Sequence, residues 1–421
     1  MNTARRGRVL RVAHHRATTA HACSAFPFQV DSGLGEDGIV LGFDVTAGGR
    51  PFAYDPFAAY AAGLVTNPNV VVAGEPGVGK SAFLKCLLVR ASGVFGRWVA
   101  VIDPKGEYAG LAETLGLSVI KLHPGGTDRL NPLEGGGADD AEDASARHAA
   151  MVAALLASVL RRDLTPLEDA ALGWATTALA RGRGEPTLAD LARLLASPSR
   201  ALAERAHMPP AQLARAVEDI TYALGKLLDR SLRGMFDGPS TVSLDLDGPG
   251  VVIDLSAVHH DPDALGLVMI ATTAWLQSVL ARPGPPRLQV LDEAWALLAS
   301  ERAARYLQAC FKLGRSYGVA NIAVVHRLSD LRAQADDGTA LAKVTAGLLA
   351  DAQTRVVFRQ SADQIGEATA ALGLTETEAG LLPRLARGRA LWRVGQRAAI
   401  VQHVIGPHDR DLCDTDERMN A

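Results

Sequence analysis

Short runs of hydrophobic residues alternate with longer stretches of helical periodicity along most of the chain. The runs are about five residues long, and they are apolar at nearly every position rather than at every second one. Such runs are typical of strands covered on both faces, and their alternation with helices indicates an α/β fold with a mainly parallel central sheet. The predicted strands are Asn69–Ala73, Trp98–Ile102, Ser118–Leu122, Val251–Leu255, Arg287–Leu291, Asn321–Val325, Thr354–Phe358 and Ala390–Val394.

One stretch, residues 139–230, is rich in Ala and Leu with helical periodicity and has no convincing strand. Two helix starts of the capping-box type support this interpretation, Thr-Pro-Leu-Glu at 165–168 and Thr-Leu-Ala-Asp at 187–190. Glycines flank the stretch, at 135–137 before it and at 234 and 238 after it. We therefore predict an all-α subdomain inserted into the α/β domain.

The length of 421 residues allows one large domain or two ordinary ones. With 48% hydrophobic and 21% charged residues, the chain is expected to form a large core, and the net charge of −3 excludes an evenly basic nucleic-acid-binding surface but not a local basic channel. The predicted division is a basic N-terminal arm and lead-in (1–48), the first part of the core (49–136), the helical insertion (137–239), the second part of the core (240–405) and a C-terminal tail (406–421).

The longest apolar segment, Leu265 to Ala281, is short for a membrane span and is expected to be a buried core helix. The four cysteines lie far apart in the sequence without a C-x-x-C pair, which favours reduced thiols in a cytosol: Cys23, Cys86, Cys310 and Cys413. We expect a cytoplasmic protein, with peripheral association at the inner face of the cell membrane through the basic arm as the alternative.

Residues 74–81 read Gly-Glu-Pro-Gly-Val-Gly-Lys-Ser and match the phosphate-binding pattern G-x-x-x-x-G-K-[ST]. The predicted strand 69–73 precedes the motif and a helix-forming run follows it, which is the context that this loop requires. Backbone N–H groups would surround the phosphates, Lys80 would reach the β- and γ-phosphates of ATP, and the Ser81 hydroxyl would bind Mg²⁺. The predicted nucleotide-binding residues of the loop are Gly74, Glu75, Pro76, Gly77, Val78, Gly79, Lys80, Ser81 and Ala82.

Two adjacent acidic residues, Asp292 and Glu293, directly follow the predicted strand 287–291. At the carboxyl edge of a sheet that also carries a phosphate loop, the first acid would hold the Mg²⁺ and its water shell. The second would polarise the attacking water as a general base. Hydrolysis is therefore favoured over passive nucleotide binding.

Four further strings resemble one family: Val-Ile-Asp-Pro-Lys-Gly-Glu-Tyr at 101–108, Asp-Glu-Ala-Trp-Ala-Leu-Leu at 292–298, Asn-Pro-Leu at 131–133 and Phe-Lys-Leu-Gly-Arg-Ser-Tyr-Gly at 311–318. In this order they resemble the HerA/FtsK-like ATPases. Within that superfamily they are similar to the VirB-type, TraC-like ATPases of conjugation and type IV secretion. The resemblance covers roughly residues 40 to 405.

The resemblance implies a RecA-like motor domain that acts as a hexameric ring, with ATP bound between subunits and a neighbour's arginine completing the site. Such an arginine stabilises charge on the transferring phosphoryl group. Three arginines in the resembling or strand segments are candidates, namely Arg315, Arg355 and Arg359.

Asp103 and Glu107 follow a predicted strand and are expected at the same sheet edge, where they would polarise the γ-phosphate side of the site or couple it to the adjacent subunit. Two features depart from the family pattern. Val325-His326 stands where the family has Thr-Gln, so His326 is a candidate γ-phosphate sensor. Only about 70 residues precede the phosphate loop, fewer than the N-terminal domain of VirB-type ATPases, so we expect the motor domain alone.

The sequence thus predicts a Mg²⁺-dependent ATPase that powers substrate transfer or apparatus assembly in a bacterial conjugation or type IV secretion system. Its expected partners are further copies of itself, proteins of that apparatus and DNA. Two alternatives stay open: a double-stranded DNA translocase or coupling protein of the same superfamily, and a nucleotide-gated assembly module with little turnover.

Overall fold

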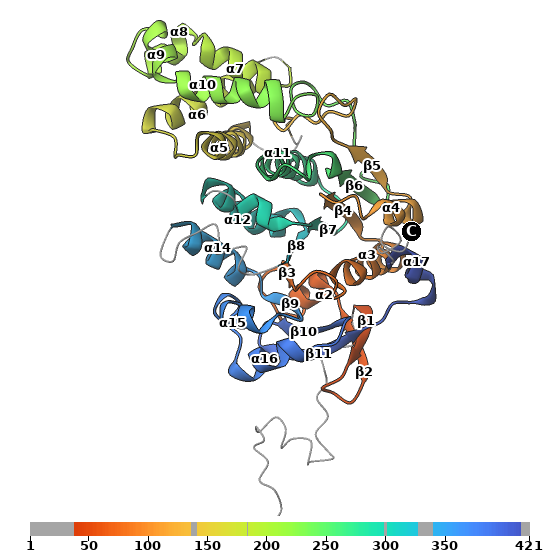
Figure 1. Ribbon diagram of the computed structural model, residues 1–421. Helices are drawn as coiled ribbons and strands as arrows, with labels where there is room; N and C mark the ends of the chain where they lie inside the picture. The colour runs from red at the N-terminus through yellow and green to blue at the C-terminus, as the bar shows by residue number, and fades with distance from the viewer. Residues whose placement is uncertain (1–37, 136–140, 183, 299–300, 327–339, 414–421) are drawn as a thin grey trace, which may run out of the picture.

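The computed structural model describes residues 38–135, 141–182, 184–298, 301–326 and 340–413. An eleven-stranded sheet with the order β2-β1-β11-β10-β9-β3-β8-β7-β4-β6-β5 runs through the core (Figure 1). The basic residues of the first sixteen positions and the end of the predicted C-terminal tail lie outside the described residues.

Seven neighbouring strands are parallel, from β9 to β5 in the sheet order. They are β3 (Val70–Ala73), β4 (Trp98–Asp103), β5 (Ser118–Lys121), β6 (Gly250–Asp254), β7 (Arg287–Leu291), β8 (Val319–Val325) and β9 (Thr354–Phe358). Every residue of β3, β4, β7 and β8 is buried, which explains why these strands read as continuous apolar runs. The prediction of a mainly parallel central sheet is confirmed.

The remaining four strands pair antiparallel at one end of the sheet: β1 (Ile39–Asp44), β2 (Arg50–Tyr54), β10 (Arg389–Val394) and β11 (Arg397–His403). Strands β1, β2 and β11 were not predicted from the sequence, and residues 39–44 were assigned to the N-terminal lead-in. Exposed residues interrupt the buried ones in β1, and β2 and β11 each begin with two exposed residues, so none of the three reads as a continuous apolar run.

Helices cover both faces of the sheet. Val70 and Val72 of β3 belong to a core with α3 (Lys80–Phe95) and α4 (Ala109–Leu115), whereas Val71 and Ala73 face the opposite core. That second core includes α11 (Pro262–Leu280), α12 (Glu301–Gly314) and α14 (Ala340–Asp351), which Figure 1 shows along the other face.

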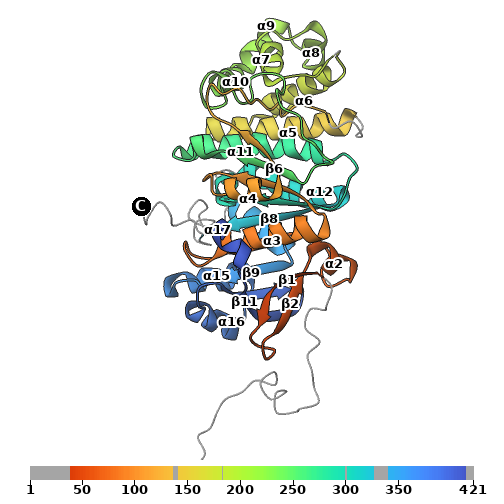
Figure 2. The same cartoon turned by 90° about the vertical axis from the view of Figure 1, so that its right-hand side faces the viewer.

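The helical subdomain forms a further layer on the α11 side. Its long helix α5 (Ala141–Leu160) packs against α11 and α12, and the shorter helices lie beyond it (Figure 2). These are α6 (Pro166–Ala180), α7 (Leu188–Ala196), α8 (Arg200–Arg205), α9 (Pro210–Ala216), α10 (Glu218–Lys226) and the π-helical turn η1 (Leu227–Ser231). The capping boxes predicted at Thr165 and Thr187 are both present.

Helix α11 is long and apolar enough to cross a membrane by length and composition, and 94% of its most apolar window is buried inside the protein. It is the helix that the apolar segment 265–281 predicts, and it packs against α5 and the sheet as a core helix.

The chain ends with small helices around the antiparallel strands, and its last described residues return to α3. The remaining helices are α2 (Pro56–Ala61), α15 (Ile365–Leu372), α16 (Glu376–Leu381) and α17 (Arg410–Cys413), with short turns η2 (Ser256–Val258), η3 (Ala294–Leu298), η4 (Arg315–Tyr317), η5 (Ala362–Gln364), η6 (Leu382–Arg384) and η7 (Pro407–Asp409).

One arginine ties two of these helices to the sheet. Arg355 of β9 donates through Nη2 to the carbonyl of Leu349 (3.2 Å), through Nη1 to the carbonyl of Leu372, and through Nε to the carbonyl of Ala352 (3.2 Å). Leu349 and Leu372 lie in the last turns of α14 and α15, where carbonyl groups lack intrahelical partners. The guanidinium therefore serves as a C-terminal cap for both helices.

We expect Arg355→Ala to lower the free energy of unfolding by about 2–4 kcal/mol, because three half-buried carbonyls lose their donor. Urea denaturation measures the change. The matched control is Arg359→Ala on the same β9–loop segment. Its side chain is 46% exposed and lies 3.6 Å from Glu75, a contact worth little to stability. Equal losses in the two variants would contradict the capping role.

Candidate nucleotide-binding site

The phosphate loop connects β3 to α3 at the carboxyl edge of the parallel strands. Gly77 has φ +75° and Gly79 has φ +108°, conformations that favour glycine. A Cβ on Gly79 would also lie 3.3 Å from the backbone nitrogen of Gly388. Glycine at these two positions therefore lets the backbone form a tight loop, or cradle, that a side chain would strain.

Neighbouring segments hold this cradle through backbone hydrogen bonds. The Gly388 N–H, just before β10, donates to the Val78 carbonyl (2.9 Å), and the Glu75 N–H donates to the Arg359 carbonyl (3.2 Å). The loop conformation therefore depends on β9 and on the lead-in to β10, which lie about 280 or more residues along the chain.

The loop fits a polyphosphate. Helix α3 is 16 residues long, and within the described chain no side chain caps its N-terminus, so the first-turn N–H groups point into the cradle unpaired by a cap. Lys80 is buried and donates to the carbonyls of Gly74 (2.5 Å) and Glu75 (2.7 Å). Burial lowers the pKa of Lys80 to about 8, although the charges of Asp292 and Glu293 oppose the shift.

Asp292 follows β7, which is separated from β3 only by β8. It is buried and accepts hydrogen bonds from the Glu293 N–H (3.0 Å) and the Tyr108 hydroxyl (3.2 Å). Burial raises its pKa, and the neighbouring charge of Glu293 adds to the effect. A bound cation would stabilise the ionised form of this buried carboxylate, and Mg²⁺ prefers oxygen ligands of this kind. Asp292 and Ser81 are the residues that would hold it.

Glu293 is held on every side. Its backbone has φ +53°, unusual for a residue with a side chain. One carboxylate oxygen contacts Lys105 and lies 2.5 Å from His326 Nε2, and the other accepts from the Trp295 indole. Burial would raise its pKa, but the hydrogen bonds and charges of His326 and Lys105 outweigh burial and lower the pKa to about 2.

Lys105 reaches Glu293 from a turn that Asp103 organises. Asp103 Oδ1 accepts from the N–H groups of Lys105 (3.1 Å), Gly106 (2.9 Å) and Glu107 (3.2 Å), and Oδ2 accepts from Tyr108 (2.9 Å). Its oxygens are thus committed to shaping this turn, so the sequence-based role of Asp103 at the phosphates does not fit. Burial raises its pKa to about 6, with the hydrogen bonds from Tyr108, Glu107 and Lys105 opposing the shift.

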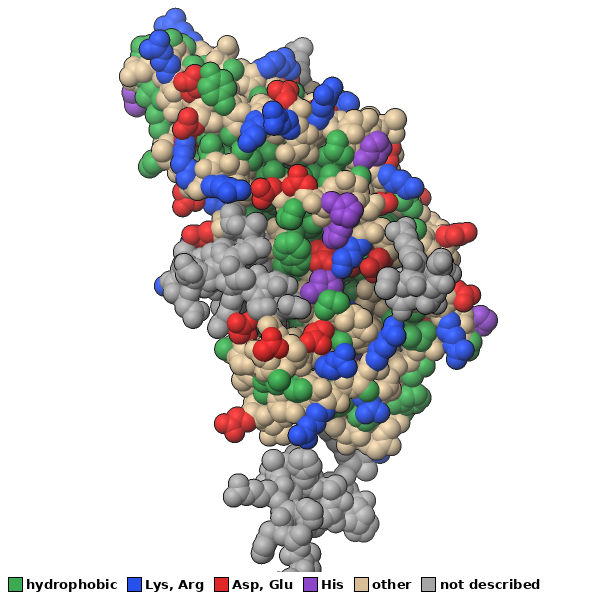
Figure 3. All heavy atoms as spheres, in the orientation of Figure 1, with side chains coloured by type: hydrophobic (Ala, Val, Ile, Leu, Met, Phe, Trp, Pro, Cys, Tyr) green, Lys and Arg blue, Asp and Glu red, His purple; other side chains and the backbone are tan. Residues whose placement is uncertain are grey.

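Glu107 is half-buried in the same turn, and its charge acts on Lys80 and on Lys85 of α3. His326 directly follows β8, and its Nε2 lies 2.9 Å from Lys105 Nζ. Its Nδ1 is buried without a hydrogen-bond partner among the described residues. Figure 3 shows basic, acidic and histidine side chains close together near the middle of the face that Figure 1 presents to the viewer.

The three candidate arginines lie in different places. Arg359 follows β9 beside the phosphate loop, 3.6 Å from Glu75. Arg315 is exposed in η4 before β8, and therefore at the amino edge of the sheet, roughly 20 Å from the loop in the same chain. Arg355 has its guanidinium committed to carbonyls of its own chain, so it is not available to a neighbouring subunit, which corrects the sequence-based assignment.

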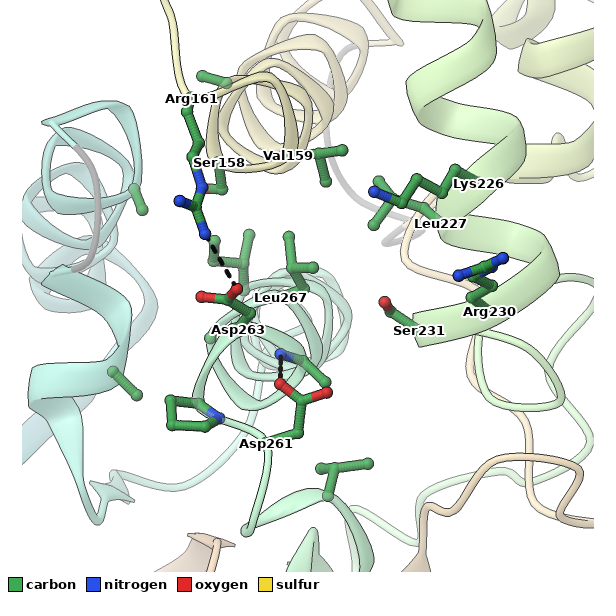
Figure 4. A pocket seen from close by; sticks show the side chains of 18 of the residues that line it. Ser158, Val159, Arg161, Lys226, Leu227, Arg230, Ser231, Asp261, Asp263 and Leu267 are labelled. Carbon is green, nitrogen blue, oxygen red and sulfur yellow. Dashed lines mark hydrogen bonds and ion pairs between the residues drawn. The ribbon is translucent and has the colours of Figure 1, made fainter.

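A small cavity adjoins the phosphate loop, and a larger one, whose lining contains no residue of the site, lies away from it. The larger, about 1080 Å³, separates the helical subdomain from the core, and Figure 4 shows its walls at α5, η1 and the start of α11. The smaller, about 280 Å³, adjoins the phosphate loop at Gly79 and Ala82.

Sequence reasoning missed Lys105, Trp295, Tyr108 and Gly388 as parts of the site. Lys105 and Tyr108 follow a predicted strand in the same way as Asp103, so the rule that carboxyl strand ends converge could have included them. Gly388 carries no such signal, because its contact joins distant segments through backbone atoms.

Sequence comparison gives no match, either to a protein-family profile or to a curated protein. Solved structures do match. VirB4 of Thermoanaerobacter pseudethanolicus is 23% identical, with 89% of this chain and 98% of that chain covered and a TM-score of 0.71. The bacterial conjugative coupling protein TrwBΔN70 in its unbound monoclinic form is 17% identical, with 88% and 89% covered and a TM-score of 0.58.

The plasmid coupling protein TrwB in complex with ADP and Mg²⁺ is 18% identical, with 80% of this chain and 86% of that chain covered and a TM-score of 0.54. The likeness in fold agrees with the fold that the sequence motifs imply. The predicted RecA-like P-loop fold is confirmed: this chain has the fold of VirB4 and TrwB.

Proposed function

We propose that the protein is an ATP-hydrolysing motor that powers substrate transfer or apparatus assembly in a bacterial conjugation or type IV secretion system. One observation carries the proposal. Lys80 and the acids Asp292 and Glu293 lie at one sheet edge, close enough for both acids to act on the charge of Lys80. The likeness to VirB4, which extends over 98% of that chain, supports the transport setting.

The residues at this edge have separable tasks. Backbone N–H groups at the start of α3 and Lys80 bind and orient the phosphates of ATP. Ser81 and Asp292 would hold Mg²⁺, which would neutralise charge on the phosphates. Glu293 accepts a proton from the attacking water.

Glu293 can take that proton only after one of its oxygens is freed. In the structure both oxygens are engaged by Lys105, His326 and Trp295, and its low pKa makes it a weak base. Lys105 and His326 therefore control when the base becomes available. In this role His326 acts on Glu293 rather than on the phosphates.

A hexameric ring would give Arg315 a role that it does not have within one chain. At the amino edge of its own sheet it is far from its own phosphate loop, so it can act only on a neighbour's nucleotide. Arg359, beside the loop, would act within its own chain.

The first test uses the full chain with ATP and Mg²⁺. We expect Glu293→Gln to lower the hydrolysis rate by about 10²-fold or more, because the base is removed, while ATP binding persists. Phosphate release and nucleotide titration measure the two effects. The control is Glu204→Gln, an exposed glutamate of α8 paired with Arg200, which should leave both unchanged. If wild type and Glu293→Gln hydrolyse equally slowly while ATP still drives assembly, the protein is a nucleotide-gated module.

A second test addresses Lys105. We expect Lys105→Met to lower kcat by about ten- to a hundredfold, because the buried acids Asp292 and Glu293 lose the cation that keeps both ionised, and a base that has already taken up a proton cannot accept one from water. The KM for ATP should change little, because Lys105 touches Glu293 and not the phosphate loop. Lys105→Arg should recover part of the rate, and Lys121→Met on the exposed edge strand β5 serves as the control. A raised KM with unchanged kcat would instead place Lys105 on the nucleotide.

The likeness to TrwB favours a second candidate function, that of a coupling protein acting on double-stranded DNA. In that case double-stranded DNA should stimulate hydrolysis, and the stimulation should fall steeply with salt as phosphate contacts are screened. Steady-state hydrolysis with and without double- and single-stranded DNA, at two salt concentrations and with the oligomer mass measured in the same buffer, distinguishes the candidates. A rate that is indifferent to DNA excludes the coupling role.

A further inference from the structure

The last described residues of the chain are fastened to the phosphate-loop helix. Arg90 of α3 pairs with Asp409 (2.9 Å) and donates to the carbonyl of Val404 (2.8 Å). Lys85 of α3 donates to the carbonyl of Leu412 (2.8 Å). Residues predicted as a C-terminal tail thus form η7 and α17 against α3.

Two thiols face each other at this contact. Cys86 of α3 is buried, Cys413 of α17 is half-buried, and their sulfur atoms lie 3.7 Å apart. Cys413 Sγ also lies 3.7 Å from the carbonyl of Ala82 in the first turn of α3. The two residues are 327 positions apart in sequence, so their meeting is a product of the fold.

The two thiols differ in acidity. The hydrogen bond from Cys86 lowers the pKa of Cys413, and the nearby charge of Lys85 acts in the same direction. The same hydrogen bond, together with burial, raises the pKa of Cys86. A more acidic, accessible thiol beside a buried neutral one is the arrangement of an attacking and a resolving cysteine.

Both thiols line the smaller cavity, which also touches the phosphate loop. Its walls include Gly79, Ala82, Phe83, Gly388, Gln402 and His403. A small oxidant that enters this cavity therefore meets Cys413 and Cys86 next to the segments that shape the cradle.

We propose that Cys86 and Cys413 form a peroxide-oxidisable thiol pair whose disulfide locks the C-terminal segment onto the phosphate-loop helix and narrows the cavity beside Gly79. The Cys413 thiolate attacks one oxygen of hydrogen peroxide, the O–O bond breaks, and hydroxide leaves, which oxidises the sulfur to a sulfenic acid. The Cys86 sulfur then attacks that sulfur, the S–O bond breaks, and water leaves with the Cys86 proton.

Closing the bond requires the sulfur atoms to approach from 3.7 Å to about 2.05 Å. Helix α17 has only four residues and buries none of them, whereas α3 has 16 residues and is anchored in the core, so α17 is the element that moves. A thiol reductant reverses the linkage and returns α17 to its hydrogen-bonded position.

The test uses full-length protein in which Cys23 and Cys310 are replaced by serine, so that only the pair remains. Peroxide should remove two thiols per chain and lower the intact mass by about 2 Da, and a non-reducing peptide map should join the Cys86 and Cys413 peptides. With Cys86→Ser, peroxide should instead leave a sulfenic acid on Cys413 that dimedone traps. With Cys413→Ser, Cys86 should stay reduced.

A disulfide that links two chains instead of Cys86 and Cys413 of one chain would overturn the pairing. So would wild-type protein in which peroxide oxidises Cys413 no faster than Cys310. The effect on the cavity rests on the proposed function and has a separate readout. Oxidised protein should lose most of its ATP hydrolysis and regain it with dithiothreitol. The Cys86→Ser variant cannot form the disulfide, so peroxide should cause no such reversible loss of its hydrolysis rate. If the disulfide forms but the rate of ATP hydrolysis does not change, the proposed effect on the phosphate loop is wrong. If the reduced protein does not hydrolyse ATP at all, that result counts against the proposed function and not against the thiol pair.

Discussion

Buried negative charge at the end of β7 is the constraint on which the site depends. Asp292 and Glu293 are adjacent in sequence and nearly inaccessible to water, and two neighbouring carboxylates cannot both stay ionised without cations. Lys105 balances Glu293 directly, and Lys80 lies within the field of both acids. Among the described residues, the hydrogen-bond partners of Asp292 are a hydroxyl and a backbone N–H, so its carboxylate is the one left with a need for a metal ion.

The parallel sheet is what brings these charges together. The carboxyl ends of β3, β4, β7 and β8 carry Lys80, Lys105, Glu293 and His326, four residues from segments spread over nearly 250 positions of the chain. Because neighbouring strands are about 4.8 Å apart, groups that follow adjacent strands lie within reach of one another. The turn shaped by Asp103 supplies the remaining adjustment, since it directs Lys105 back across the sheet edge.

The sequence predicted eight of the strands, most of them from continuous apolar runs and two of them with the observed ends. It also predicted the residues of the phosphate loop and of the acidic pair. These features are local, because a buried strand and a glycine-rich loop can both be recognised from residues that are adjacent in the sequence. What the sequence did not reveal is contact between distant segments. The backbone support of Val78 by Gly388, the helix caps supplied by Arg355 and the engagement of Glu293 by Trp295 depend on side-chain directions and on strand order. Half-exposed strands such as β1 and β11 lack the continuous pattern and were missed for the same reason that the central strands were found.

The acidic pair is also connected to the helical subdomain through a short stretch of chain. Glu293 has an unusual backbone conformation, and the residues after it form η3, which packs against α11 and α12. Ala296 of η3 lies in the wall of the large cavity between the core and the helical subdomain. The base and the cavity wall therefore lie three residues apart on one stretch of backbone, which α11 and α12 hold from its other end.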